Sequence, residues 1–229
     1  MAAKKGGLGK GLEVLFAENS IEEEGKTVSL PISEIEPNRA QPRKQFDDEA
    51  LAELSASISQ HGVLQPLLVR PVAGGSYQLV AGERRWRASR MAGLTEVPVV
   101  IREMSDKEAA ELALIENLQR EDLNPMEEAM GYRTLMETYG LTQEETAKSV
   151  NKSRPAVANA LRLLHLPDTI AQMVAGGELS AGHARALLAF ATEEEQLDAA
   201  AAAVDKSLSV RDLERMAKAS RAPRNEKEA

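Results

Sequence analysis

The sequence contains no cysteine, which excludes a disulfide framework, a thiolate metal site and a thiol-based enzyme. Aromatic residues make up only 3% of the 229 residues. Because strands draw on aromatic and β-branched residues, this shortage, together with plentiful alanine and leucine, favours helices over sheet. No apolar run approaches the roughly 20 residues that span a bilayer, and the N-terminus lacks the apolar core of a secretory signal. We therefore expect a cytoplasmic protein without a membrane partner.

Positive charge is in the minority, with 28 Lys and Arg against 36 Asp and Glu and a net charge of −8. An excess of acid argues against a nucleic-acid partner, because phosphates are neutralised by clustered cations. The distribution reverses that inference, since residues 82–102 hold five arginines against two glutamates and residues 142–166 hold four cations against two glutamates. Local basic patches on an acidic chain can bind polyanions.

The chain is long enough for one large domain or two small ones, with tails. Residues 1–26 are rich in glycine and lysine around a short apolar patch, which predicts either a disordered tail or a peptide that folds on contact with a partner. Residues 27–121 alternate strand and helix patterns, and residues 122–220 show successive short helices with capping boxes. Residues 221–229 are charged and lack an apolar period, so they read as a linker. The predicted fold class is α+β, a small mixed sheet with helices followed by an all-helical domain.

Four arginines fall within the seven positions 84–90, directly after the alternating apolar stretch Tyr77–Ala81. If that stretch is a strand and the arginines open a helix, the junction presents backbone N–H groups, a positive dipole end and guanidinium forks to one small anion. The pattern predicts a phosphate-binding corner at Gly82–Arg90. A solvated basic helix face is the alternative.

Two short helical patterns, Gln143–Val150 and Arg154–Leu164, meet tightly around Asn151. Ala147 is small where the two helices must cross, and asparagine tolerates the left-handed backbone that a tight turn requires. This spacing predicts a DNA-reading helix-turn-helix, with a plain helical hairpin as the alternative.

The second helix of that unit would present its N-terminal side to the DNA groove, where arginine can pair with guanine and asparagine with adenine. Flanking polar and basic residues are candidates for phosphate contacts, which position a protein without specifying sequence. The predicted DNA-binding residues of this segment are Gln143, Lys152, Ser153, Arg154, Asn159 and Arg162.

A third cluster, Glu116–Arg120, brings a carboxylate, an amide and a guanidinium close together at the end of a predicted helix. Such a set can hold a hydrated divalent cation and a phosphate at once, as magnesium-nucleotide sites do. Alone it is also the pattern of an ordinary helix terminus.

Four stretches, taken in their order and spacing, resemble the ParB family of bacterial chromosome-partitioning CTPase clamps. They are Gly62–Leu67 (GVLQPL), Gly82–Ala88 (GERRWRA), Glu116–Arg120 (ENLQR) and Lys152–Asn159 (KSRPAVAN). A plain repressor would leave the second and third stretches without a purpose, and a small-molecule phosphotransferase of the same α/β fold would not explain the helix-turn-helix. The resemblance runs from about Leu8 to about Met216.

The resemblance implies a ParB/sulfiredoxin-like N-terminal domain that binds CTP with Mg²⁺, followed by a helix-turn-helix domain that binds the centromere-like palindrome parS. Binding at parS would close a homodimer into a sliding clamp through its N-terminal domains, and CTP hydrolysis would reopen it. The alternative function is a CTP-independent helix-turn-helix transcriptional repressor. Carried over by motif, the nucleotide would contact Gln65, Gly82, Arg84, Arg85, Asn117 and Arg120, the metal would contact Glu116 and Asn117, and Glu83 and Glu116 would support hydrolysis.

The resemblance also implies partners and a location. Leu8, Lys10 and Leu12 match a peptide that stimulates a ParA ATPase, and a location on the nucleoid follows from the DNA partner. Gly182, His183 and Arg185 match a stretch that adds DNA contacts, with an ordinary surface helix residue as the alternative for His183. Family members usually continue past a linker like 221–229 into a C-terminal dimerisation domain, so we expect either a truncated protein or a short member.

Overall fold

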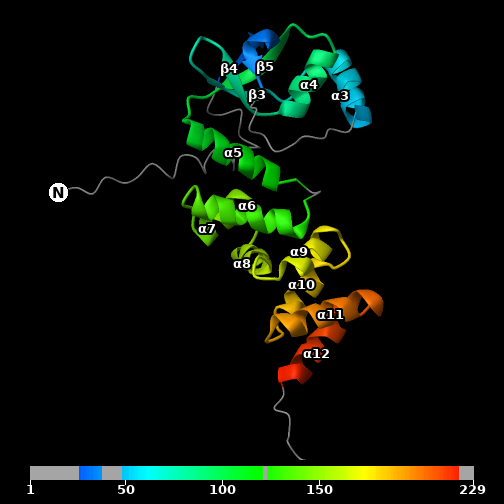
Figure 1. The fold of residues 1–229 in the computed structure, drawn as a ribbon. Helices are drawn as coiled ribbons and strands as arrows, with labels where there is room; N and C mark the ends of the chain where they lie inside the picture. Colours follow the sequence, from blue (N-terminus) through cyan, green and yellow to red (C-terminus); the bar gives the residue numbers. More distant parts are fainter. Residues whose placement is uncertain (1–25, 38–47, 121–122, 222–229) are drawn as a thin grey trace, which may run out of the picture. The chain divides into compact units, whose positions relative to one another are not determined.

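The computed structural model describes residues 26–37, 48–120 and 123–221. The chain clusters into two compact units, residues 1–117 and 118–229 (Figure 1). The predicted N-terminal peptide with Leu8, Lys10 and Leu12 lies outside the described residues, as does the linker beyond Arg221. Within the described ranges, no helix has both the length and the apolar character needed to cross a membrane.

The first unit is built on a five-stranded mixed sheet in the order β1-β5-β3-β4-β2. The neighbouring pairs β1/β5 and β3/β4 are antiparallel, whereas β3/β5 and β2/β4 are parallel. Positive φ angles at Gly74 and Gly75 form the turn between β3 and β4, where glycine carries no steric penalty. The strands are β1 (Thr27–Pro31), β2 (Ile35–Glu36), β3 (Leu67–Pro71), β4 (Tyr77–Ala81) and β5 (Glu96–Ile101), and the short 3-10 helix η2 (Ile32–Glu34) joins the first two.

Alternating residues of the central strands form the core of this unit. Successive side chains of a strand point to opposite faces of the sheet, so residues two apart share one face. Leu67 and Val69 of β3 and Val97 and Val99 of β5 are such pairs, and all four are completely buried. Trp86 joins them from helix α4 (Glu83–Met91), and the helices α3 (Asp48–His61) and α4 pack side by side (Figure 1). The packing holds the start of α4 next to the end of β4.

Helix α5 (Asp106–Leu118) is tied at its start to strand β3. The buried side chain of Arg70 donates from Nε to the Gln78 Oε1 atom at 2.8 Å and from Nη1 to the Met104 carbonyl at 3.3 Å, and it forms an ion pair with Asp106. A buried guanidinium needs such partners to offset its lost hydration. The arginine therefore fixes where the helix that carries Glu116 and Asn117 begins.

The second unit is entirely helical in its described part. Most of its helices begin at a polar cap, as at Asn124, Thr142, Ser153, Ser180 and Thr192. The helices are α6 (Pro125–Glu137), α7 (Gln143–Ser149), α8 (Arg154–Leu163), α9 (Asp168–Ala175), α10 (Ala181–Leu187), α11 (Glu193–Asp205) and α12 (Val210–Arg221).

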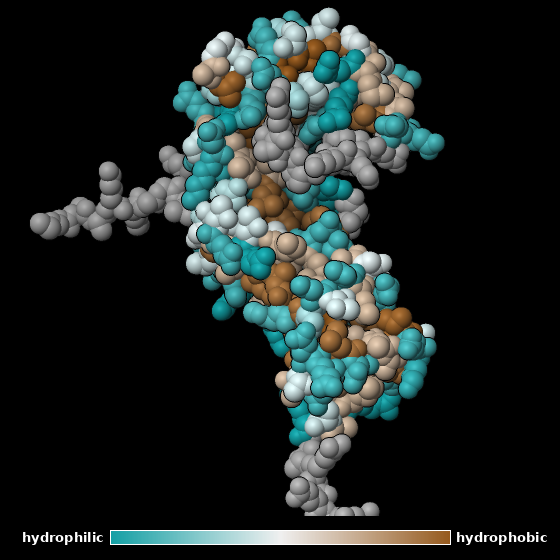
Figure 2. All heavy atoms as spheres, viewed as in Figure 1, coloured by the Kyte–Doolittle hydropathy of each residue, from teal (hydrophilic) through white to brown (hydrophobic). Residues whose placement is uncertain are grey.

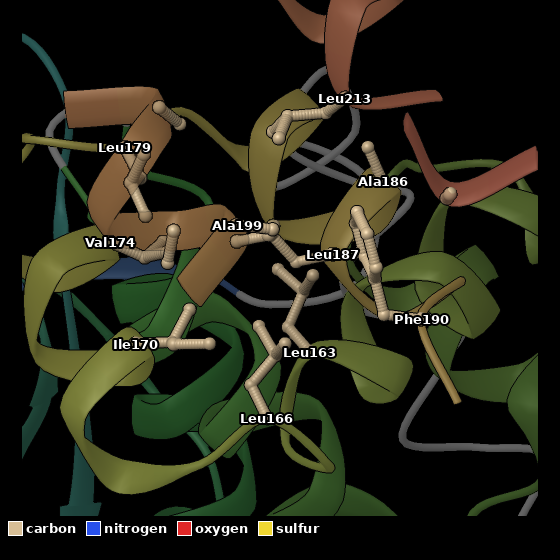
Figure 3. Close-up of a cluster of buried hydrophobic side chains, with 14 residues drawn as sticks. Leu163, Leu166, Ile170, Val174, Leu179, Ala186, Leu187, Phe190, Ala199 and Leu213 are labelled. Atoms are coloured by element: carbon tan, nitrogen blue, oxygen red, sulfur yellow. The ribbon is translucent and has the colours of Figure 1, made fainter. Parts of the chain in front are cut away.

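The main core of the helical unit lies where α8 to α12 meet. Side chains of Leu163, Ile170 and Leu187 point toward one another in Figure 3, and each is almost completely buried. Alanines on α10 and α11 let the helices approach closely around them. On the face shown in Figure 2, apolar residues of this unit are interspersed with polar ones, as expected for short amphipathic helices.

The α+β fold class predicted from the sequence is confirmed, with a mixed sheet preceding a run of short helices. The two-residue strand β2 was not predicted, since its parallel pairing with β4 depends on a distant segment rather than on a local pattern. The domain boundary predicted at residue 121 stays a prediction.

Gly131 of α6 receives the last residue of α5. A Cβ atom at Gly131 would lie 2.4 Å from Cδ2 and 3.0 Å from Cγ of Leu118, which is itself buried. Glycine is otherwise unfavourable inside a helix, by about 1 kcal/mol relative to alanine. The close approach explains why glycine occupies this helical position.

We expect Gly131→Ala to lower the free energy of unfolding by a net 1 kcal/mol or so, because overpacking costs about 1–3 kcal/mol and the gain in helix propensity is about 1 kcal/mol. Urea unfolding of Gly131→Ala, Leu118→Ala and the double variant measures these free energies. In the Leu118→Ala background the same change should be neutral or stabilising. A single Gly131→Ala variant more stable than the parent protein would contradict the packing.

Candidate nucleotide and DNA sites

The predicted phosphate-binding corner begins with a left-handed backbone at Gly82, where φ is 98° and ψ is 29°. Gly82 is the N-cap of α4, and no side chain caps that end of the helix. A Cβ atom there would lie 2.9 Å from Cδ2 of Leu67 and 3.3 Å from the Arg85 guanidinium. Both the conformation and the crowding therefore require glycine. The strand-to-helix turn presents backbone amides and the positive end of the helix dipole, the features that favour an anion.

The structure gives the four clustered arginines different surroundings. Arg85 donates from Nη1 to the carbonyl oxygens of Gln65 and Pro66, at 2.9 and 2.8 Å, which fixes the loop before β3. Arg87 bonds Glu83, and the Arg90 guanidinium lies over the Trp86 ring, 4.9 Å from its centroid.

Arg84 differs from the other three arginines of the cluster. Its side chain is exposed and makes no hydrogen bond or ion pair with another described residue. Gln65 is also exposed, and the Arg85 contact uses its backbone carbonyl. The structure thus brings together Gln65, Gly82 and Arg85, three residues that the sequence predicted for one site, and it leaves Arg84 directed to solvent.

Glu83 is the first residue of α4, and one of its carboxylate oxygens is bound by Arg87. Arg87 donates from Nε and Nη2 to the same Glu83 Oε1 atom, at 2.9 and 2.6 Å, and the Glu83 side chain is 10% exposed. The second carboxylate oxygen has no hydrogen bond to a described side chain and can accept one from water. The arginine four residues along the helix is a partner that the i,i+4 spacing could have predicted.

The Glu116–Arg120 cluster lies at the end of α5, as predicted. Glu116 is exposed and Asn117 is half-buried on the last turn of the helix, and Arg120 follows the helix in the second unit. Their meeting with the Gly82 corner stays a prediction. Leu118 and Gln119, which stand between Asn117 and Arg120 in sequence, belong to the helical unit. Gln119 donates from Nε2 to the Ser149 carbonyl at 3.2 Å. This bond could not be predicted from a local pattern, because it joins residues that are far apart in sequence.

The predicted helix-turn-helix forms from α7 and α8. Asn151 adopts φ of 55°, and the Lys152 N–H bonds the Ala147 carbonyl at 2.9 Å to complete the turn. Ala147 and Val157 are buried, and Ala160 is partly buried. A capping box starts α7. Hydrogen bonds to the Glu145 carboxylate from the Thr142 backbone N–H and, to a smaller extent, from the Thr142 hydroxyl lower the pKa of Glu145.

The residues predicted to contact DNA mostly face solvent. Ser153 is the N-cap of α8, and its Oγ atom accepts from the Ala156 N–H at 3.3 Å. Its hydroxyl proton remains able to donate. Helix α8 has no acidic residue, so a phosphate near its start meets no opposing charge from that helix. Four predicted residues are exposed, Lys152, Ser153, Arg154 and Arg162, and two are half-buried, Gln143 and Asn159.

The second predicted DNA-contacting stretch opens α10. His183 completes a capping box in which its Nδ1 atom lies 3.3 Å from the Ser180 backbone nitrogen and 3.1 Å from the Ser180 hydroxyl. Accepting the backbone N–H requires an unprotonated Nδ1, which leaves the hydrogen of a neutral ring on Nε2. Gly182 has a packing role, since a Cβ there would lie 2.9 Å from Cγ2 of Val210, and Arg185 is exposed.

Comparison with known proteins shows the family of this chain. The family model of the ParB N-terminal domain matches residues 17–118, and the model of the ParB HTH domain matches residues 121–222. The chain belongs to the ParB family. The chromosome-partitioning protein Spo0J of Thermus thermophilus is 54% identical over 214 residues, which is 93% of this chain and 77% of that protein.

Two solved structures of ParB from Caulobacter crescentus also match. C-terminally truncated ParB complexed to the centromeric parS site is 46% identical, covers 84% of this chain and 99% of its own, and has a TM-score of 0.76. C-terminally truncated ParB complexed with CTP-gamma-S is 50% identical and covers 76% of this chain and 97% of its own, with a TM-score of 0.40. The first of these supports the ParB fold of this chain over most of its length.

The separate roles of the ParB arginines lead to a stability prediction. We expect Arg85→Ala to lower the free energy of unfolding by about 1–2 kcal/mol, because two carbonyl oxygens lose a charged donor. Arg84→Ala, a matched change at the exposed neighbour, should stay within about 0.5 kcal/mol of the parent protein. Chemical unfolding measures both. Equal loss in the two variants would refute the different roles.

Proposed function

We propose that this ParB-family chain is a CTP-dependent switch that binds a parS palindrome and closes on DNA in chromosome segregation. The observation that carries the proposal is the presence, in one chain, of the Gly82 corner and the α7–α8 helix-turn-helix, with ParB models matching residues 17–118 and 121–222. A repressor needs the second element and has no use for the first.

DNA is read by α8. Arg154 and Asn159 are the candidates for base contacts, because arginine suits the acceptor edge of guanine and asparagine the edge of adenine. Gln143, Lys152, Ser153 and Arg162 are the candidates for backbone phosphates, and His183 and Arg185 of α10 add contacts with Gly182 at the helix start. The exposed position of Arg154 at the first turn of α8 supports its role.

The triphosphate of the nucleotide binds at the Gly82 corner. Backbone amides at the start of α4 and the exposed Arg84 supply donors, while Arg85 holds the Gln65 loop beside them. Asn117 and Arg120 are further phosphate ligands. Glu83 supports hydrolysis by accepting a hydrogen bond from water at its second carboxylate oxygen, with Arg87 holding the first. The preference for cytosine rests on membership of the ParB family.

Mg²⁺ accompanies the nucleotide. Glu116 and Asn117 carry the oxygen atoms that this ion prefers, and Glu116 is exposed. Among the described residues, no three or more Asp, Glu, His or Cys side chains are grouped so that they could hold a metal ion. When bound, the ion neutralises charge on the phosphate oxygens.

The nucleotide works as a switch between two states of a homodimer. Preferential binding of CTP to the closed state shifts the population toward a clamp on flanking DNA, and hydrolysis, assisted by Glu83 and Glu116, lets the clamp reopen. Slow hydrolysis is sufficient for such a role.

The N-terminal peptide with Leu8, Lys10 and Leu12 stimulates a ParA ATPase, and the protein is associated with the nucleoid.

CTP turnover measured with and without a parS duplex tests the proposal. We expect hydrolysis that depends on Mg²⁺ and rises when the duplex is added, while a scrambled duplex of equal length leaves it unchanged. A CTP-independent repressor would bind the duplex without turnover. Turnover that requires a small-molecule acceptor and ignores DNA would indicate a phosphotransferase.

Arg154→Ala should weaken binding to parS by about 1–3 kcal/mol while leaving binding to random DNA almost unchanged, because the lost contact reads a base. Fluorescence anisotropy at fixed salt concentration measures both affinities. Arg133→Ala, which removes an exposed arginine from α6, is the control. Equal loss on parS and random DNA would make Arg154 a phosphate contact instead.

A further inference from the structure

The end of helix α7 is completed by a residue from outside the helix-turn-helix. The last four carbonyl groups of a helix lack partners within it and must find them elsewhere. In α7 the carbonyls of Thr146, Ala147 and Lys148 accept from backbone N–H groups of Val150, Lys152 and Asn151 within the turn itself. The remaining carbonyl, of the buried Ser149, accepts from Gln119 Nε2 at 3.2 Å.

Gln119 belongs to the stretch that carries the proposed phosphate ligands. It follows Asn117 by two residues and directly precedes Arg120. A backbone shift of Asn117 or Arg120 toward a phosphate also displaces Gln119, because the spacing of consecutive Cα atoms is fixed.

Leu118, in the same stretch, packs closely against helix α6. Its buried side chain fills the space left by the missing Cβ of Gly131 in α6, and Gln119 bonds the last carbonyl of α7. The two residues therefore contact two successive helices of the second unit. Close packing transmits displacement because it leaves no slack. A shift of the stretch therefore reaches both α6 and the turn that orients α7 against α8.

We propose that Gln119 is a positioning residue that couples nucleotide binding to DNA reading by holding the last carbonyl of α7. This inference rests on the proposed function, since it needs both ligands. Gln119 itself contacts neither base nor phosphate in this role. Its loss should reduce the coupling factor, the ratio of the parS dissociation constants with and without nucleotide, rather than one affinity alone.

The test compares coupling factors in the full chain. Dissociation constants for a parS duplex are measured with and without CTP-gamma-S and Mg²⁺ in the parent protein, Gln119→Met and Gln119→Lys. Methionine keeps the length of the side chain without a donor, whereas lysine keeps a donor. Gln172→Met makes the matched change at an exposed glutamine of α9.

We expect the factor to move about 2- to 10-fold toward one in Gln119→Met, as the loss of one net hydrogen bond allows, to recover in Gln119→Lys and to stay unchanged in Gln172→Met. A purely structural role would weaken binding equally with and without nucleotide, so an unchanged factor in Gln119→Met overturns the inference. If that variant does not fold, Gln119→Asn, whose amide is one methylene shorter, gives the same comparison. A factor of one in the parent protein would instead overturn the proposed function, and the inference with it.

Discussion

The left-handed backbone at Gly82 is the constraint on which the proposed nucleotide site depends. Only glycine allows β4 to turn into α4 there, because a side chain would meet Leu67 in the core and the guanidinium of Arg85. That guanidinium in turn bonds the loop before β3 through two carbonyls. One backbone conformation thus sets the start of the helix, the position of Gln65 and the exposure of Arg84.

Local patterns predicted much of this protein. The glycine before the arginines, the asparagine in the tight turn and the Thr142 capping box act within a few residues, so the sequence displays them directly. Partners that come together only on folding could not be predicted, such as the carbonyls that hold Arg85 or the contact of Gln119 with Ser149. The arginine cluster looked uniform in sequence, yet Arg87 and Arg90 find partners on their own helix, whereas Arg85 finds its partners only through tertiary packing.

Several residues proposed to contact DNA also stabilise the starts of helices. Ser153 caps α8 while its hydroxyl proton stays available, and His183 caps α10 through Nδ1, which leaves Nε2 outside the capping contact. Gly182 is required by its approach to Val210 before any ligand is considered. Because the same atoms stabilise the helix starts and face the proposed partner, fold and recognition are built together, and substitutions here must be judged against stability.

A crystal structure of the chain with CTP and Mg²⁺ would show whether the Gly82 corner holds the triphosphate. We expect triphosphate oxygens that accept hydrogen bonds from backbone amides at the start of α4 and from Arg84, with Arg85 still bonded to the Gln65 and Pro66 carbonyls. A triphosphate bound away from Gly82, or an Arg84 side chain that stays in solvent while the nucleotide is bound, would contradict this expectation.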